Sequence, residues 1–214
     1  MKPTRNARNQ MGGAGLLASL ADGEASLAFL DPQYRGVLDK MKYGNEGARQ
    51  KGRAALRQMS DDDIEFFVQE IARVLRPKGH LCLWVDKFTI VEGRHLAWMR
   101  AAPALARVDM ITWRKTRPGM GKRARCYGEH MIILQKKPTA AKGIWRDHGI
   151  DDVWLEGADR DAHTHAKPIG LTTRMVKCVT RPRDLVVDPC AGGFGVLEAC
   201  RATGREFIGC DLVG

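Results

Sequence analysis

The sequence predicts an α/β fold built on a mostly parallel, twisted sheet with helices on both faces. Three observations support this: short apolar runs alternate with amphipathic segments, two of these runs end in Asp-Pro, and no internal repeat divides the chain. Such alternation is typical of parallel sheets, because each crossover places a helix on one face of the sheet. The 214 residues suffice for one core, so we expect a single domain over residues 1–214.

The first third of the chain contains a buried strand and a capped helix. Residues 1–13 are polar and basic, and we expect them to be irregular. The apolar run 26–30 predicts a buried strand that ends at Asp31-Pro32, since proline cannot continue a central strand. A helix is expected to begin after Ser60, with three aspartates in its first turn, and to stop at Pro77-Lys78-Gly79.

The remaining elements follow in the same alternation. Further strands are expected at 80–85, 108–113, 130–134, 185–188 and 206–210, and further helices at 16–20, 92–104, 171–179 and 196–202. Segments 35–59 and 114–127 are rich in Lys, Arg and Gly and are predicted to be basic loops, while segment 136–165 is polar and irregular.

Composition limits the kinds of partner, ligand and cellular setting that we expect. The formal net charge is +10 and the pI is about 9.6, which favours a polyanionic partner over a merely solubilising surface. The six cysteines form no C-x-x-C pair, so we expect a reducing, cytoplasmic setting without disulfides or zinc. His163 and His165 form an H-x-H pair with no suitably spaced third ligand, and no metal is expected. No apolar run approaches the about 18–20 residues of a membrane span, and neither a membrane nor a signal peptide is expected.

A glycine-rich turn follows the expected strand 185–188. Its sequence, Asp188-Pro189-Cys190-Ala191-Gly192-Gly193-Phe194, lets the backbone approach a ligand closely. The next strand ends at Asp211, whose carboxylate can accept hydrogen bonds from ribose hydroxyls. Dinucleotide binding is the first alternative, but the turn lacks the G-x-G-x-x-G spacing that it requires. The sequence also has no G-x-x-x-x-G-K-[S/T] loop, which argues against an NTPase.

A second motif, Asp31-Pro32-Gln33-Tyr34, lies at the carboxyl end of the strand 26–30. It offers a carboxylate, backbone carbonyls released from the sheet, and an aromatic ring. Asp31 and the Pro32 carbonyl can each accept one hydrogen of an exocyclic amine, and Tyr34 can stack on the ring that carries it. On its own, such a tetrapeptide is also an ordinary strand end with a surface tyrosine.

The two motifs together resemble the β-type DNA amino-methyltransferases, in which the catalytic motif precedes the cofactor motif. That family carries Asp-Pro-Pro-Tyr early, then Leu-x-Pro-Gly-Gly, His-x-x-x-Lys-Pro and Asp-Pro-Phe-x-Gly-Ser-Gly. The corresponding segments here are 31–34, 75–79, 163–168 and 188–194, and the resemblance covers residues 11–214 in the family's order. It implies a Rossmann-like methyltransferase fold with one antiparallel strand.

The chain departs from the family's pattern at several positions. Gln33 replaces the second proline, Cys190 replaces phenylalanine, and Phe194 replaces the last glycine. Gly12-Gly13 stands near the place where the family usually has Gly-Asp, so the carboxylate that contacts the cofactor adenine there is lost or supplied elsewhere.

The resemblance implies direct transfer of a methyl group from S-adenosylmethionine to the N6 amine of adenine in DNA, after the base is flipped out of the duplex. The implied catalytic residues are Asp31, Pro32 and Tyr34. The implied cofactor-binding residues are Asp31, Lys167, Pro168, Asp188, Pro189, Cys190, Ala191, Gly192, Gly193, Phe194 and Asp211. The implied DNA contacts are Lys40, Lys42, Arg49, Lys51, Arg53, Arg114, Lys115, Arg117, Lys122, Arg123 and Arg125. Segment 136–165 is expected to be a small recognition insert, and a homodimer is a further expectation.

Three alternatives stay open. An N4-cytosine DNA methyltransferase is disfavoured by Asp31, because the cytosine enzymes usually carry Ser-Pro-Pro-Tyr. An RNA adenosine N6-methyltransferase is disfavoured by Tyr34, because that family uses Asp-Pro-Pro-Trp. A non-catalytic DNA-binding relic is suggested by Gln33, by Phe194 and by the missing early aspartate.

Overall fold

The structure is a computed structural model that describes residues 2–33, 58–119, 123–157 and 166–212. Most of the predicted basic loop 35–59 lies outside these residues, as do Tyr34 and the His163–His165 pair. Among the described residues, no helix combines the length and apolar character needed to cross a membrane.

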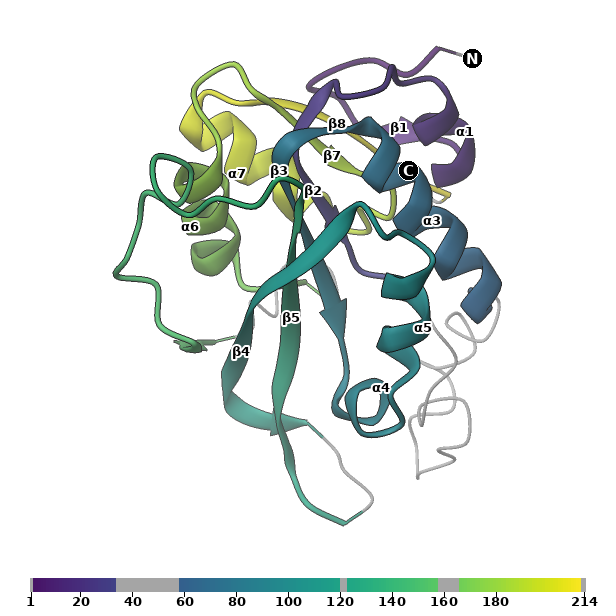
Figure 1. The fold of residues 1–214 in the computed structure, drawn as a ribbon. Coiled ribbons are helices and arrows are strands. Elements are labelled where there is room, and N and C mark those ends of the chain that lie inside the picture. Colours follow the sequence, from purple (N-terminus) through teal and green to yellow (C-terminus); the bar gives the residue numbers. More distant parts are fainter. Residues whose placement is uncertain (1, 34–57, 120–122, 158–165, 213–214) are drawn as a thin grey trace.

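One sheet organises the described chain (Figure 1). Its strands are β1 (Asn9–Gln10), β2 (Ala25–Leu30), β3 (Leu75–Val85), β4 (Leu105–Gly119), β5 (Cys126–Lys136), β6 (Val153–Glu156), β7 (Leu185–Asp188) and β8 (Glu206–Asp211). They lie in the order β1-β8-β7-β2-β3-β5-β4-β6. β5 runs antiparallel to both of its neighbours, and the other pairs are parallel, which confirms the predicted fold class with one antiparallel strand.

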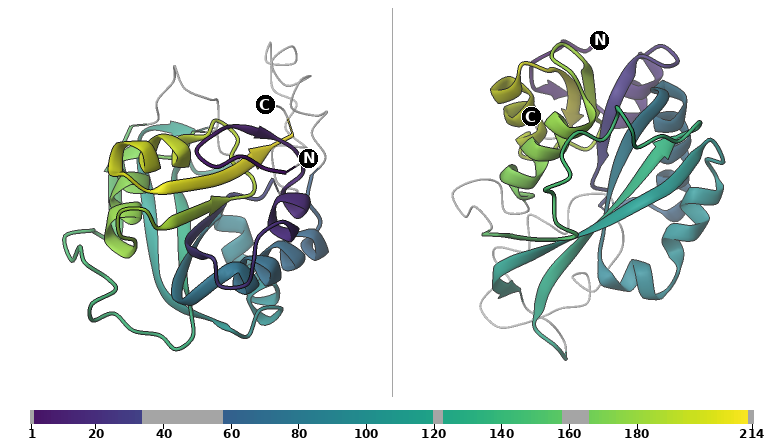
Figure 2. Two further views of the ribbon diagram at one scale, coloured as in Figure 1. Left: turned by 90° about the horizontal axis from the view of Figure 1, so that it is seen from above. Right: turned by 60° about the vertical axis from the view of Figure 1, so that its left-hand side comes forward.

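Helices cover both faces of this sheet (Figure 2). On one face lie α1 (Gly13–Ala18), α3 (Asp61–Val74), α4 (Lys87–Val91) and α5 (Arg94–Arg100), and on the other lie α6 (Ile169–Val179) and α7 (Gly195–Thr203). The strand period of two explains the split, because Ala28 and Leu30 of β2 pack against α3 while Leu27 and Phe29 face α6 and α7.

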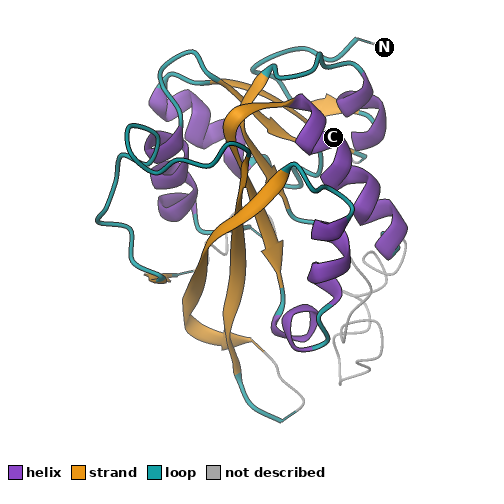
Figure 3. Ribbon diagram, viewed as in Figure 1, coloured by secondary structure: helices purple, strands orange, loops and turns teal. Residues whose placement is uncertain are grey.

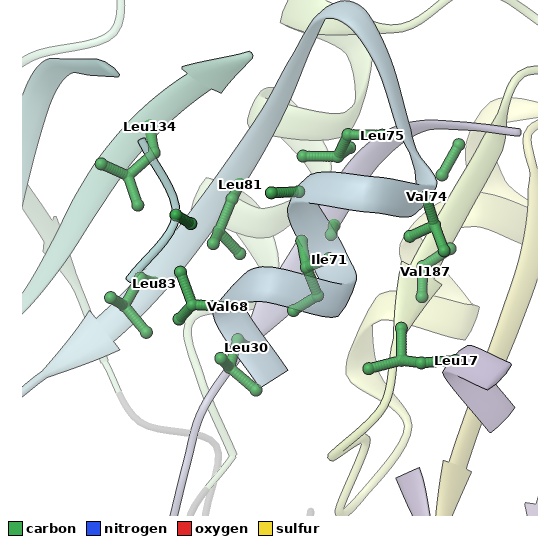
Figure 4. Close-up of a cluster of buried hydrophobic side chains, with 14 of the residues drawn as sticks. Leu17, Leu30, Val68, Ile71, Val74, Leu75, Leu81, Leu83, Leu134 and Val187 are labelled. Atoms are coloured by element: carbon green, nitrogen blue, oxygen red, sulfur yellow. The ribbon is translucent and has the colours of Figure 1, made fainter. Parts of the chain in front are cut away.

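Helix α3 has both a capped N-terminus and an apolar face that packs on the sheet. The hydroxyl of Ser60 accepts from the backbone N–H of Asp63, and the Asp63 carboxylate accepts from the backbone N–H of Ser60. Three aspartates in the first turn favour the helix dipole. Val68 and Ile71 then pack against Leu30 and Leu83 in the buried cluster drawn in Figure 4.

Several predicted boundaries are wrong. Helix α3 ends at Val74, and Pro77-Lys78-Gly79 already belongs to β3, whose pairing with β2 contains a register shift. The predicted loop 114–127 is strand at 114–119 and 126–127, where β4 and β5 pair as an antiparallel hairpin; Figure 3 shows both strands extending beyond the helices. Segments 1–13 and 136–165 were predicted to be irregular, but they contain the short edge strands β1 and β6. Neither strand has the buried apolar run on which a strand prediction depends.

We predict that the stability of the fold falls with acid through His80, at the start of β3. The side chain is 2% exposed, and its Nδ1 has no hydrogen-bond partner among the described residues. Burial lowers the pKa of His80 to about 4. The unfolded chain binds a proton from near pH 6.5, whereas the folded chain does so only near pH 4, so the stability is intact above this window and is lost as pH falls through it.

The expected loss between pH 6.5 and pH 4 is about 3 kcal/mol, measured as the free energy of unfolding in urea at a series of pH values. His80→Leu should flatten this slope, whereas His148→Leu, at an exposed position, should leave it unchanged. An equal slope in the wild type and in His80→Leu would contradict the assignment.

Candidate active site

Three aspartates lie at the carboxyl ends of adjacent parallel strands. Asp31 follows β2, Asp188 ends β7, and Asp211 ends β8. β7 pairs with both β2 and β8, so Asp188 lies between the other two, and the charges of both neighbours act on its carboxyl group. Ligands of open α/β sheets bind at this edge, so these strand ends mark the candidate site.

The turn after β7 is tied to these aspartates by its backbone. The N–H of Cys190 donates to Asp188 Oδ1 at 3.2 Å, and the N–H of Gly192 donates to Asp211 Oδ2 at 3.2 Å. The N–H of Ala191 donates to the Cys210 carbonyl at 2.9 Å. The turn therefore bridges β7 and β8 and holds the two carboxylates on either side of it.

Asp188 has an unusual protonation equilibrium. Burial raises the pKa of its carboxyl group to about 8; the hydrogen bond from Cys190 opposes the shift, and the negative charges of Asp31 and Asp211 add to it. Asp188 is therefore protonated at neutral pH, and a cation that approached it would lower this pKa and displace the proton.

Helix α1 begins against the same turn. A Cβ placed on Gly13 would lie 2.4 Å from the Pro189 carbonyl oxygen and 2.7 Å from the Phe67 ring. Position 13 therefore admits only glycine without backbone movement. This packing leaves no room for an aspartate at position 13, whereas a Cβ on Gly12 would meet open space.

Phe194 occupies a backbone conformation that favours glycine. Its φ is 59° and its ψ is 30°, in the left-handed region, at the cap of α7. The side chain is buried and meets the Phe207 ring edge to face at 6.3 Å, with the Arg8 guanidinium 5.3 Å from the Phe194 ring centroid. Burial of the ring thus offsets the backbone strain at a position where the family that the chain resembles carries glycine.

Asp31 is held by a lysine. Lys167 Nζ lies 3.0 Å from Asp31 Oδ2 and 2.8 Å from Glu129 Oε2, and Glu129 also pairs with Lys115. Desolvation raises the pKa of Asp31, although 35% of the side chain stays exposed, and Lys167 opposes this shift. Burial lowers the pKa of Lys167, but Asp31 and Glu129 outweigh it, so the net pKa is raised and the lysine stays charged.

The structure locates part of the predicted site. Pro32 is buried directly after Asp31, the Gln33 carbonyl accepts from the Met59 N–H at 2.8 Å, and Pro168 is the cap of α6. The side chains of the hairpin arginines are exposed, namely Arg114, Arg117, Arg123 and Arg125. The predicted residues Tyr34, Lys40, Lys42, Arg49, Lys51, Arg53 and Lys122 lie outside the described residues.

Glu129 was missed by the sequence analysis. It follows the basic segment 114–127 and is the sole acidic residue between Asp109 and Lys136, a contrast that could have drawn attention to it. Lys115, predicted to contact nucleic acid, is half-buried and paired with this residue. Among the described residues, no group of three or more His, Cys, Asp or Glu side chains is arranged to hold a metal ion.

Comparison with known proteins places this site in context. The family described as DNA methylase, N6_N4_Mtase, matches residues 25–213. The chain is 49% identical over 209 residues to the type II methyltransferase M.HhaII of Haemophilus parahaemolyticus, and the match covers 97% of this chain and 91% of that protein.

Solved structures share the fold. The cytosine-N4-specific PvuII DNA methyltransferase superposes with a TM-score of 0.73 at 15% identity, covering 99% of this chain and 83% of that one. A putative DNA modification methylase of Thermus thermophilus, TTHA0409, solved in complex with S-adenosyl-L-methionine, gives a TM-score of 0.64 at 21% identity, covering 94% of this chain and 87% of that one.

We predict that glycine is better tolerated than alanine at position 194. Either substitution removes a buried ring, which costs roughly 3–5 kcal/mol, but only glycine also relieves the left-handed strain. Phe194→Gly should therefore be more stable than Phe194→Ala by about 1 kcal/mol, measured by urea unfolding with equal m-values.

Phe207, buried in β8, provides the matched control. There the order should reverse, because glycine weakens a strand interior. If alanine were the better residue at both positions, the backbone at Phe194 would not be strained.

Proposed function

Because the chain belongs to the N6/N4 DNA methylase family and is an S-adenosylmethionine-dependent DNA methyltransferase, we propose that its target is the exocyclic N6 amine of adenine. The observation that carries the proposal is the carboxylate of Asp31 at the end of β2, followed directly by the buried Pro32. By resemblance, an N4-cytosine enzyme carries serine at the position of Asp31.

Asp31 and the Pro32 carbonyl would each accept one hydrogen of the target amine. The amine lone pair of adenine is delocalised into the ring, and two acceptors aligned with its N–H bonds favour a nitrogen whose lone pair is localised. When bound, S-adenosylmethionine would supply the methyl group: the methyl–sulfur bond would break as the bond to the amine nitrogen forms, S-adenosylhomocysteine would leave with the electron pair, and the nitrogen would release one proton to water. The negative charge of Asp31 offsets the positive charge that develops on the amine nitrogen.

The residues around the β7 turn fit this cofactor. Asp188 and Asp211 flank a turn whose backbone is fixed on both sides, and they present carboxylates to a ligand that carries positive charge and ribose hydroxyls. In this proposal the residues from Asp188 to Phe194, together with Asp211, hold the cofactor.

DNA would approach over the β4–β5 hairpin. Arg114, Arg117, Arg123 and Arg125 are exposed along it and suit phosphate contacts. The target base would have to flip out of the duplex for its amine to reach Asp31, at a cost of a few kcal/mol. A recognition role for segment 136–165, stacking by Tyr34, phosphate contacts from the basic segment 35–59 and pairing of two copies stay predictions.

The experiment that tests the proposal is mass spectrometry of nucleosides after incubation with duplex DNA and S-adenosylmethionine, with RNA as a competing substrate. We expect N6-methyladenine in the DNA. Asp31→Asn should lower the rate by about 100-fold or more, because the charge near the amine is lost. Asp62→Asn, in the exposed first turn of α3, is the matched control and should keep the wild-type rate.

Two results would overturn this assignment. N4-methylcytosine as the product would reject adenine as the target base, and methylated adenosine in the RNA competitor alone would reject DNA as the substrate.

We predict that cofactor affinity rises with pH until about pH 8. Below this pH, Asp188 carries a proton that binding of a cationic ligand must expel; above it, the carboxylate is already ionised. The dissociation constant for S-adenosylmethionine should therefore fall by up to about tenfold per pH unit below pH 8 and then level off. Calorimetry in buffers of different ionisation enthalpy should detect the released proton.

Asp188→Asn should flatten this profile, while Asp62→Asn should reproduce that of the wild type. Cofactor binding with no proton release between pH 6 and pH 8 would rule out the titration of Asp188.

A further inference from the structure

Lys167 joins two carboxylates that come from distant parts of the chain. Its Nζ lies 3.0 Å from Asp31 Oδ2, at the end of β2, and 2.8 Å from Glu129 Oε2, in β5. Lys167 itself stands two residues before α6. The three side chains are 21–35% exposed, so this arrangement is partly withdrawn from solvent.

Lys115 completes the group as a second cation. It pairs with Glu129 from β4, so that two lysines alternate with two carboxylates in the order Lys115–Glu129–Lys167–Asp31. Burial raises the pKa of Glu129, but Lys167 and Lys115 outweigh this effect and lower it to about 2. Glu129 is therefore ionised throughout the physiological range.

Two tryptophans flank the lysines. Lys167 Nζ lies 5.2 Å from the centroid of the Trp84 ring, and Lys115 Nζ lies 4.8 Å from that of Trp113. The two rings meet edge to face at 6.2 Å, and both are buried. Trp113 is the direct cross-strand partner of Glu129, so the β4–β5 register fixes the carboxylate beside the aromatic pair.

We propose that Glu129 is a positioning residue for methyl transfer, which holds Lys167 on Oδ2 of Asp31 and leaves Oδ1 to accept the target amine; this rests on the proposed function. A lysine ammonium on a four-carbon stem has three donors and no preferred direction. Contact with Glu129 and with the Trp84 ring confines it, and Lys115 supplies the second positive charge that balances the two carboxylates. Glu129 thus acts on the reaction only through Lys167.

The same ion pairs make it unfavourable for Lys167 or Lys115 to contact a DNA phosphate. Each ammonium already has a carboxylate partner within ion-pair distance, and transfer to a phosphate would leave Glu129 or Asp31 partly buried without its cation. Lys167 is then a constraint on Asp31 rather than a cofactor contact.

The first test needs neither cofactor nor DNA. The full chain is treated with an amine-reactive ester, and mass spectrometry follows the labelling rate of each lysine. In Glu129→Gln, Lys167 should react at least about fivefold faster than in the wild type, because the loss of the anion lowers its pKa and frees its ammonium. Lys142, exposed on the surface, should keep its rate.

The second test is a double-mutant cycle on the single-turnover rate at saturating DNA and S-adenosylmethionine. Glu129→Gln and Lys167→Met should each lower the rate by about tenfold to 100-fold with dissociation constants unchanged within about threefold, because a misplaced group affects the transition state. The double variant should be no slower than Lys167→Met, and Lys167→Arg should restore part of the rate. Glu198→Gln, which removes an exposed ion pair to Arg201, is the matched control.

Three outcomes would overturn the inference: unchanged labelling of Lys167 in Glu129→Gln, multiplicative effects in the double variant, or a loss confined to cofactor affinity. The proposed function fails separately, in the wild type, if no N6-methyladenine forms. Wild-type activity with an unimpaired Glu129→Gln variant would reject the positioning role alone.

Discussion

The burial of Asp188 between the carboxylates of Asp31 and Asp211 is the constraint on which the rest of the site depends. Parallel pairing of β2, β7 and β8 places Asp31, Asp188 and Asp211 at one edge, and each is stabilised differently. Asp31 has the ammonium of Lys167, and Asp211 accepts a backbone N–H from the turn. Asp188 has one backbone N–H and keeps a pKa of about 8. Asp188 is therefore the carboxyl group that a cation would ionise, while Asp31 is already paired.

The parts of the fold that the sequence predicts correctly are those in which local pattern and burial coincide. The runs 26–30 and 185–188 are buried throughout, and both strands lie where they were expected. The hairpin was missed because the outer halves of β4 and β5 are polar, and their pairing depends on the cross-strand register rather than on burial. Glu129 was missed for a related reason: its partners become neighbours only when β2, β5 and the segment before α6 are assembled.

Two of the departures from the family's motifs, at Gly13 and at Phe194, have local physical explanations. Gly13 lies so close to the Pro189 carbonyl that a side chain there would displace the turn. Phe194 keeps the left-handed backbone of a glycine and offsets its strain by burying a ring against Phe207. Neither compensation is visible in the sequence, because each depends on a contact with a distant segment.

The excess of positive charge is divided between two roles. Lys115 and Lys167 are neutralised in pairs beside Asp31, so they contribute little to the field that a polyanion would experience. Arg114, Arg117 and Arg123 on the hairpin form no ion pair with the described acidic residues, and Arg114 lies over the exposed Tyr127 ring. The charges of these hairpin arginines are therefore not compensated by described acidic residues, while the charges beside Asp31 are balanced. With this separation, the proposed phosphate contacts would strengthen or weaken with salt without changing the electrostatics of Asp31, because exposed charges are screened and partly buried pairs are screened much less.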